Sequence, residues 1–188
     1  MRKIVVGVTG ASGSLLAIRT LEALRDVADV ETHLVMSKEA PRTLELEAPG
    51  CTAADLERLA DVVYRQENLA AAISSGSFLT AGMIVVPCSM KTASAVAHSY
   101  NDNLLARAAD VTLKERRPLV LVVRETPLHL GHLRMLVQLA EIGAIILPPI
   151  VGFYTRPKTI DDVVNHTVGK ALDQLGVEHD LFARWSGA

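Results

Sequence analysis

The chain has 188 residues, with 19 lysine and arginine residues against 21 aspartate and glutamate residues. This length suits one domain, and the near-neutral charge argues against a nucleic-acid-binding protein, which would carry a basic surplus. Hydrophobic residues form 49% of the chain and aromatic residues only 4%, which argues against disorder and predicts an aliphatic core. We expect a single domain over residues 1–188 with a C-terminal tail from about residue 177.

The expected strands are short apolar runs without polar alternation, as in strands buried on both faces of a sheet. They cover residues 4–8, 31–36, 62–64, 83–86, 119–123 and 144–147. The expected helices have apolar stripes or capping residues and cover residues 14–27, 37–47, 52–59, 90–98, 103–116, 130–142 and 160–175. This alternation predicts an α/β fold in three layers, with a doubly wound parallel sheet at the centre.

Three local signals set expected element boundaries. Ser37 is expected to be the N-cap of helix 37–47. Thr52 is expected to cap the next helix, with Asp55 at the capping-box position. Pro87 is expected to close the strand before it.

Membrane and redox signals point to a cytoplasmic protein. No apolar stretch approaches the ~20 residues that a membrane span needs, and the apolar run at residues 4–8 breaks into a glycine-rich turn without a cleavage pattern. Cys51 and Cys88 are too few for a disulfide framework, and the aliphatic neighbours of Cys88 indicate a reduced, buried thiol. We expect binding neither to membranes nor to nucleic acid.

Polar or reactive residues follow four of the expected strands, at residues 9–13, Ser37, residues 88–92 and the pair Arg124 and Glu125. Doubly wound parallel sheets bind ligands at the carboxyl ends of their strands. These four segments are therefore expected to converge on one crevice.

A glycine-rich turn, Gly-x-x-Gly-x-x-Gly at residues 7–13, joins the first strand to the first helix. Glycines let a ligand approach the backbone, and a helix N-terminus attracts anions, so a nucleotide or phosphate is the expected guest; a plain tight turn is the alternative. The pattern differs from the dinucleotide fingerprint and from the P-loop. A short-chain dehydrogenase is rejected, because Pro157 would break the helix that its Tyr154 and Lys158 pair requires.

Other candidate site residues have competing structural interpretations. Ser89 either faces a ligand or caps a helix, and Cys88 is expected to be buried rather than nucleophilic. Arg107 and Lys114 share a helical face, where two cations can hold a phosphate or simply face solvent. His129 and His132 lack a third metal ligand, so a capping or surface role is favoured.

Aromatic residues are few enough for their positions to be informative. Phe153 and Tyr154 follow a strand end, and they either belong to a site or pack as a hydrophobic staple against helix 160–175. Trp185, in the tail, is expected to pack on its own domain or on a neighbouring subunit.

Taken together, these motifs resemble the flavin prenyltransferases, the UbiX-type flavoproteins, including the small subunit associated with bacterial phenolic acid decarboxylases. The resemblance covers nearly the whole chain. It rests on the joint order and spacing of residues 8–13, Ser37 and Lys38, Glu47, residues 87–92, residues 107–125, residues 152–154, and Arg184 and Trp185.

The resemblance implies a flavodoxin- or Rossmann-like flavoprotein fold and a metal-independent transferase. Such enzymes join a dimethylallyl group from dimethylallyl phosphate to N5 and C6 of reduced FMN. The product, prenylated FMN, serves UbiD-type decarboxylases. The family forms homo-oligomers, commonly dodecamers, with sites at subunit interfaces.

By position, the resemblance assigns three sets of site residues. The catalytic set comprises Ser12, Glu47 and Glu125, of which Ser12 and Glu125 handle protons. The FMN-binding set comprises Gly10, Ala11, Ser12, Ser37, Ser89, Met90, Lys91, Thr92 and Arg124. The substrate-binding set comprises Arg107, Lys114, Arg124, Tyr154, Lys170 and Trp185.

The chemistry of these residue types agrees with the assignment. Cations stabilise a departing phosphate, a Tyr154 or Trp185 ring faces an allylic cation, and a carboxylate such as Glu125 accepts a proton. Position 170 is Lys where some members have Arg, so the bidentate fork is lost. Two alternatives remain: an FMN-dependent cysteine-type decarboxylase, and a non-catalytic FMN-binding subunit of an aromatic acid decarboxylase.

Overall fold

A computed structural model describes residues 1–187 of the chain. Its sheet has six parallel strands in the order β3-β2-β1-β4-β5-β6. The strands are β1 (Arg2–Val8), β2 (Val30–Met36), β3 (Val62–Tyr64), β4 (Gly82–Cys88), β5 (Leu119–Val123) and β6 (Ile145–Ile146). The strand order reverses between β1 and β4, which is where doubly wound sheets form their ligand crevice.

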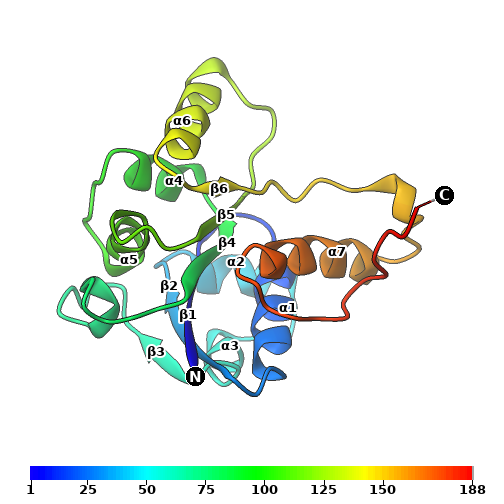
Figure 1. Ribbon diagram of the computed structural model, residues 1–188, viewed down its shortest axis with the longest axis horizontal. Coiled ribbons are helices and arrows are strands. Elements are labelled where there is room, and N and C mark those ends of the chain that lie inside the picture. The colour runs from blue at the N-terminus through cyan, green and yellow to red at the C-terminus, as the bar shows by residue number, and fades with distance from the viewer. Residues whose placement is uncertain (188) are drawn as a thin grey trace.

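Helices cover both faces of the sheet, so the expected three-layer α/β fold is confirmed (Figure 1). The α-helices are α1 (Ser14–Arg25), α2 (Ala40–Glu47), α3 (Ala53–Glu57), α4 (Met90–Ala97), α5 (Leu104–Lys114), α6 (Leu130–Glu141) and α7 (Ile160–Asp173). Two short 3₁₀ turns, η1 (Ala72–Ser74) and η2 (Phe153–Thr155), were not expected from the sequence.

The core is aliphatic on both sides of the sheet. Ile4 and Ile84 face the layer that contains α1 and α7, whereas Met83 and Leu121 face the layer that contains α4 and α5. All four side chains have no exposed surface. Each such burial is worth about 1.5–3 kcal/mol, so the strands form a fixed support for the loops at their carboxyl ends.

Two expected boundaries are wrong. Helix α2 begins at Ala40 after Glu39, not after Ser37, because Pro41 fits only the first turn of a helix. The Ser37 N–H instead donates to the Val8 carbonyl at 2.8 Å. Strand β4 continues through Pro87 to Cys88, because the pairing register shifts there and a proline without an N–H is tolerated at such an irregularity.

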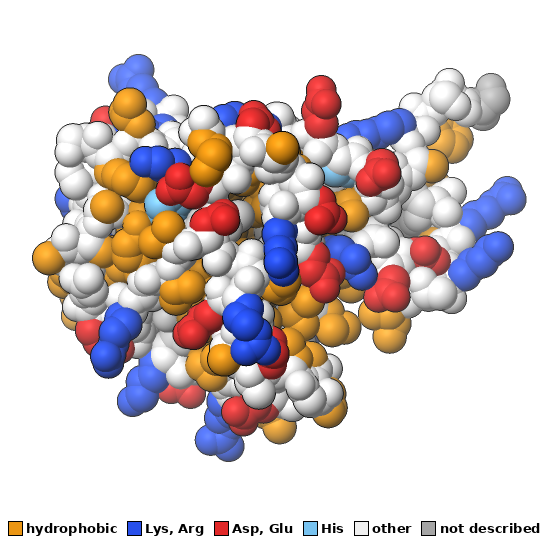
Figure 2. Space-filling view, turned by 90° about the horizontal axis from the view of Figure 1, so that it is seen from below, with side chains coloured by type: hydrophobic (Ala, Val, Ile, Leu, Met, Phe, Trp, Pro, Cys, Tyr) orange, Lys and Arg blue, Asp and Glu red, His pale blue; other side chains and the backbone are white. Residues whose placement is uncertain are grey.

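The Thr52 prediction is confirmed, since Thr52 and Asp55 form a capping box at the start of α3. No helix within residues 1–187 has both the length and the apolar character needed to cross a membrane. Charged side chains of both signs are mixed over the face seen in Figure 2, in keeping with the net charge of −2.

The segment after β6 leaves the sheet and carries η2 beyond the end of α7, far from α4 and α5 (Figure 1). The C-terminal residues return along α7 to the same end of the molecule. Of the expected tail, Ala188 lies outside the described residues.

Candidate functional site

A cleft of about 1080 Å³ opens where the loops after β1, β2, β3 and β4 meet the first turn of α5. Five residues of the expected FMN-binding set line it: Gly10, Ser37, Ser89, Lys91 and Thr92. The expected convergence of the segments after β1, β2 and β4 is therefore observed. The volume is ample for a mononucleotide, since ligand pockets commonly span roughly 300–1,000 Å³.

Buried Thr9 ties two loops of this cleft together. Its hydroxyl donates to the Pro87 carbonyl at 2.7 Å and accepts from the Ser89 N–H at 3.0 Å. The Ala11 N–H also approaches this hydroxyl, at 3.4 Å. Because Thr9 is only 2% exposed, these bonds are shielded from water and hold the loops after β1 and β4 in register. The sequence placed Thr9 at a strand end but did not reveal this role.

Gly10 allows the loop after β1 to lie against the start of α2. A Cβ at this position would lie 2.6 Å from Glu39 Cβ, closer than real Cβ contacts come. The Thr43 hydroxyl donates to the Gly10 carbonyl at 3.0 Å and fixes the same approach. Gly10 is therefore required by packing as well as by its place on the cleft wall.

Glu47 caps the N-terminus of α1. Its Oε2 accepts from the N–H groups of Gly13 and Ser14, at 2.9 and 2.7 Å. Burial raises the pKa of Glu47, but hydrogen bonds from the Ser12 side chain and from these N–H groups outweigh burial and hold the pKa below its usual value. The N–H groups of Gly13 and Ser14 are thus already occupied and are not available to a phosphate at this glycine-rich turn.

Ser89 combines the two roles that the sequence left open. Its hydroxyl oxygen accepts from the Thr92 N–H at 3.2 Å, so it is the N-cap of α4. Ser89 and Thr92 also line the cleft, together with exposed Lys91. Met90, by contrast, packs against the core on the α4 side.

Cys88 is not a nucleophile in this fold. It is completely buried, and burial raises the pKa of its thiol to about 12. The thiolate, which is the reactive form, is therefore scarce at neutral pH. The expectation of a buried, unreactive Cys88 is confirmed.

His129 has the capping role that the sequence favoured. Its Nδ1 accepts from the N–H groups of Gly131 and His132 at the start of α6. The two imidazole rings stack with centroids 3.6 Å apart. Residues 1–187 contain no group of three or more His, Cys, Asp or Glu side chains arranged to hold a metal ion.

Arg124 and Glu125 leave β5 beside the end of β4. The Arg124 N–H donates to the Cys88 carbonyl at 3.1 Å, which sets this pair next to Ser89. Both side chains are exposed, and neither lines the cleft of the isolated chain. The fourth strand-end segment therefore adjoins the crevice without forming its wall.

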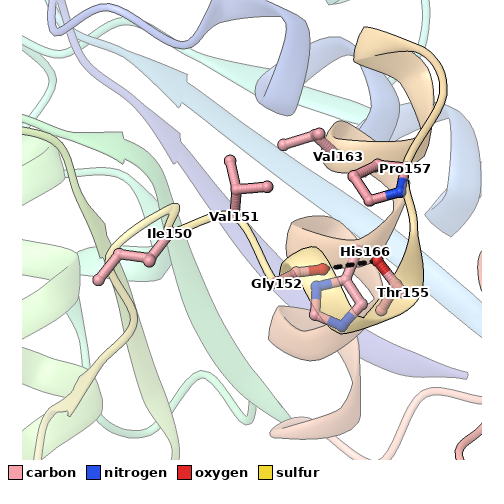
Figure 3. Close-up of a pocket in the computed structure, with 7 residues that line it drawn as sticks. All are labelled: Ile150, Val151, Gly152, Thr155, Pro157, Val163 and His166. Carbon is pink, nitrogen blue, oxygen red and sulfur yellow. Dashed lines mark hydrogen bonds between the residues drawn. The ribbon is translucent and has the colours of Figure 1, made fainter.

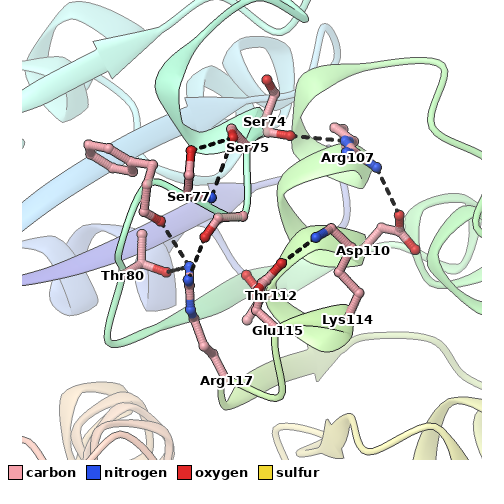
Figure 4. A network of polar contacts seen from close by, with 12 residues as sticks. Ser74, Ser75, Ser77, Thr80, Arg107, Asp110, Thr112, Lys114, Glu115 and Arg117 are labelled. Atoms are coloured by element: carbon pink, nitrogen blue, oxygen red, sulfur yellow. Dashed lines mark hydrogen bonds and ion pairs between the residues drawn. The ribbon is translucent and has the colours of Figure 1, made fainter.

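Arg107 and Lys114 do not converge on one anion within the chain (Figure 4). They are seven positions apart on α5, or about 10.5 Å along the helix axis. Arg107 donates to the Ser74 carbonyl at 3.1 Å and pairs with Asp110 at 3.2 Å, whereas Lys114 pairs with Glu115. Lys114 ends α5, whose first turn borders the cleft, so it lies at the far end of that helix.

Three expected substrate residues form what we call the arm cluster: Tyr154 on η2, Lys170 on α7 and Trp185 in the C-terminal segment. The Tyr154 and Trp185 rings lie perpendicular with centroids 6.0 Å apart. Phe153 and Tyr154 are 79% and 65% exposed, yet the Tyr154 ring meets His166 of α7 edge to face with centroids 6.2 Å apart, so Tyr154 contacts this helix without being buried on it. No residue of the arm cluster lines the cleft.

A small hollow near Tyr154 is a gap in the packing rather than a ligand site. It lies between the segment Ile150 to Pro157 and the α7 side chains Val163 and His166 (Figure 3). It has no room for a water molecule. The hydroxyl of Thr155 turns inward and donates to the Gly152 carbonyl at 2.7 Å.

Comparison with known proteins gives a consistent result. Residues 1–172 match the family model described as Flavoprotein. The Escherichia coli (strain K12) protein "Flavin prenyltransferase UbiX" is 57% identical over 190 residues, which cover 100% of both chains.

Two solved structures superpose on the chain with TM-scores of 0.96. One, AnUbiX (PadA1) in complex with FMN and dimethylallyl pyrophosphate, is 48% identical and aligns over 100% of this chain and 98% of its own. The other, a dodecameric FMN-dependent UbiX-like decarboxylase from Escherichia coli O157:H7, is 51% identical and aligns over 98% of this chain and 100% of its own.

Proposed function

Because this chain belongs to the UbiX-type flavin prenyltransferases of the flavoprotein family, we propose that it transfers a dimethylallyl group to reduced FMN. The observation that carries this proposal is the cleft at the carboxyl edge of the sheet, lined by five residues of the FMN-binding set. The resulting prenylated FMN would be passed to a UbiD-type decarboxylase.

The residues of the cleft fit FMN as the acceptor substrate. Gly10 leaves the backbone open on one wall, and Ser37, Ser89 and Thr92 offer hydroxyl groups on the others. Lys91 contributes a positive charge at the rim, suited to a phosphate. Ala11, Ser12, Met90 and Arg124 complete the proposed FMN-binding set. Reduced FMN supplies the nucleophilic N5 and C6 to which the prenyl carbons become joined.

The donor side of the reaction requires cations and a π face. Arg107, Lys114, Arg124 and Lys170 are proposed to receive the phosphate as the allylic C–O bond breaks, once subunits assemble. Tyr154 and Trp185 present aromatic rings that stabilise a developing allylic cation. Their mutual distance of 6.0 Å leaves both rings available at an exposed surface.

We propose that a second copy of the chain completes this donor site. In one chain the arm cluster and Lys114 lie away from the cleft. Apolar Leu130, Leu133 and Val137 are exposed along α6, and contiguous exposed apolar side chains mark interfaces. The dodecameric assembly of a 51% identical structure supports the same arrangement.

Proton handling is assigned to Ser12 and Glu125, with Glu47 in a supporting role. Glu47, whose pKa is held below its usual value, is ionised at neutral pH and keeps the Ser12 hydroxyl oriented. Ser12, whose side chain hydrogen-bonds Glu47, is proposed to relay a proton at this turn. Glu125, at the end of β5, is proposed as the base that removes a proton from the flavin adduct.

We also place the protein in the cytoplasm. Cys51 and Cys88 are both free thiols, as is usual in a reducing compartment.

Anaerobic incubation of the purified protein with reduced FMN and a dimethylallyl donor tests the function. Dimethylallyl phosphate and dimethylallyl pyrophosphate form parallel arms. The released flavin should be heavier by one prenyl unit with the preferred donor, and Glu125→Gln should impair transfer while FMN stays bound.

Bound but unmodified FMN in both arms would contradict the proposal and favour the non-catalytic FMN-binding subunit. Release of CO₂ from a cysteine-terminated peptide would instead favour the cysteine-type decarboxylase.

A further inference from the structure

Residues 177–187, which we call the tail, fold back along α7. The chain reverses at Gly176, whose φ of +61° suits glycine. Beyond it, buried Val177 and half-buried Leu181 pack against the core on the α1 side. The tail is therefore docked on its own chain before its last residues reach Trp185.

One carboxylate holds this tail by two contacts. Asp173 Oδ2 accepts from Arg184 Nη1 at 2.7 Å, and Asp173 Oδ1 lies 3.2 Å from His179 Nε2. The Arg184 hydrogen bond holds the pKa of Asp173 below its usual value, so the carboxylate is charged at neutral pH. Arg184 also lies over the Phe182 ring, 4.9 Å from its centroid.

His179 links the tail to α7. Its Nε2 faces the Gly169 carbonyl at 2.9 Å, Asp173 Oδ1 at 3.2 Å and Arg184 Nη2 at 3.2 Å. Its Nδ1 faces a donor, the Leu181 N–H at 3.3 Å. A proton on Nε2 serves the two oxygen atoms and leaves Nδ1 to accept from Leu181, with Arg184 Nη2 then in contact with Nε2 without a hydrogen bond. The side chain is only 4% exposed, so the bridge is shielded from water.

Gly169 makes room for this contact. It lies inside α7, where glycine weakens a helix relative to alanine. A Cβ there would lie 2.5 Å from both His179 Cε1 and Phe182 Cε1. The glycine therefore opens the surface of α7 to the two tail rings at the expense of helix propensity.

The arm cluster depends on the same contacts. Trp185 directly follows Arg184, and its ring meets Tyr154 edge to face. Lys170 Nζ lies 3.7 Å from Asp173 Oδ2, the oxygen that also accepts from Arg184. A single carboxylate thus touches one member of the cluster and orients a second through Arg184.

We propose that Asp173, with Gly169 and His179, forms a clasp that positions Trp185 and Lys170 for the prenyl donor. These are positioning residues, since they act through the arm cluster. The inference rests on the proposed function for its catalytic part, whereas the docking of the tail is measurable without catalysis.

Trp185 is the single tryptophan of the chain, so its fluorescence reports on the tail directly. We would compare the FMN-loaded full-length protein with Asp173→Asn, Gly169→Ala and Arg184→Gln variants. Asp161→Asn, an exposed change of the same kind in the first turn of α7, is the matched control. Acrylamide quenching of Trp185 and the KM for the dimethylallyl donor are measured on each protein.

The three clasp variants should raise the quenching constant at least about 2-fold and the donor KM about 5- to 10-fold, because a displaced group loses its alignment. FMN affinity should stay within about 2-fold in all proteins, since no clasp residue lines the cleft. The control should match the parent in every readout.

Unchanged quenching in all three variants would overturn the clasp, whatever the kinetics. Increased quenching with unchanged donor KM would show a docked tail without a positioning role and would overturn the proposal. Absence of transfer in the parent would instead count against the proposed function, while the quenching data would still test the clasp. If Gly169→Ala fails to fold, Arg184→Gln still tests the clasp, because Arg184 is exposed.

Discussion

The cleft and the arm cluster are built in opposite ways. The cleft is closed by bonds between residues distant in sequence, such as Thr9 with Pro87 and Glu47 with Gly13. The arm cluster stands on an exposed turn and a tail, with Tyr154 and Trp185 65% and 69% exposed. The cleft is thus preorganised within one chain. The exposed rings of the arm cluster, by contrast, are expected to be covered by a second copy of the chain.

This difference suits the two substrates. A large cofactor needs many fixed contacts, which loops on a rigid sheet provide. The small dimethylallyl donor needs a few charged groups and an aromatic ring in a site that excludes water. A second copy of the chain can complete such a site on assembly. A change in one region should therefore leave the other largely unaffected.

The largest effect is expected at the cleft, from Gly10→Ala. The added methyl group cannot coexist with Glu39 Cβ at 2.6 Å, and overpacking typically costs about 1–3 kcal/mol. FMN affinity should fall about 10- to 100-fold by titration, while Trp185 quenching stays as in the parent. Glu39→Gly in the double variant should restore part of the affinity; unchanged FMN binding in Gly10→Ala would refute the packing role.

Glu47→Ala should lower the free energy of unfolding by about 1–3 kcal/mol, because two N–H groups at the start of α1 lose their acceptor. Glu47→Gln keeps an acceptor and should cost less, about 0.3–1 kcal/mol, through the lost charge at the helix end. Urea unfolding at neutral pH measures both. Equal stability of all three proteins would contradict the capping role.

The pH dependence gives the same prediction an independent check. Since the folded pKa of Glu47 lies below its usual 4.5, its stabilisation is present above that value and is lost as pH falls through the folded pKa. The parent should therefore lose more stability than Glu47→Gln when the pH drops below about 4.5. Parallel pH profiles for the two proteins would rule this out.

At the arm cluster a smaller effect is expected from Lys170→Arg. An arginine restores the bidentate fork for a phosphate, so the donor KM should fall about 2- to 5-fold, with FMN affinity unchanged. Lys170→Met, which removes the charge, should raise the donor KM. A rise in KM for both variants would indicate that Lys170 does not bind the phosphate.

The smallest effect on transfer is expected from Cys88→Ala. The buried thiol, with a pKa of about 12, takes no part in the chemistry, so kcat should stay within about 2-fold of the parent. In the folded protein an alkylating reagent should label the partly exposed Cys51 and spare Cys88. Loss of transfer in a folded Cys88→Ala protein would contradict this account.

Local sequence patterns predicted the helices and strands better than the long-range contacts between them. Apolar runs located the strands, but the Glu47 contact with Gly13 spans 34 residues and the Thr9 contact with Pro87 spans 78. No local pattern contains such contacts. The position of Pro41 could have moved the expected start of α2 from Ser37 to Ala40, since proline favours the first turn.

The charged side chains of α5 show the same limit. Helical spacing predicted that Arg107 and Lys114 share a face, but not that each has a carboxylate partner. Asp110, three residues after Arg107, was a usable signal, because residues three apart meet on a helix. The association of the arm cluster with the cleft came only from the family resemblance, since one chain keeps them apart.

Subunit complementation tests most directly whether cleft and arm cluster of one active site come from different copies. Gly10→Ala, defective in the cleft, and Lys170→Met, defective in the arm cluster, would be purified separately and as one co-expressed mixed assembly. If sites form between copies, the mixed assembly should transfer more than the sum of the two variants, because some sites combine an intact cleft with an intact arm. Transfer no greater than that sum, in assemblies verified to contain both chains, would contradict the account.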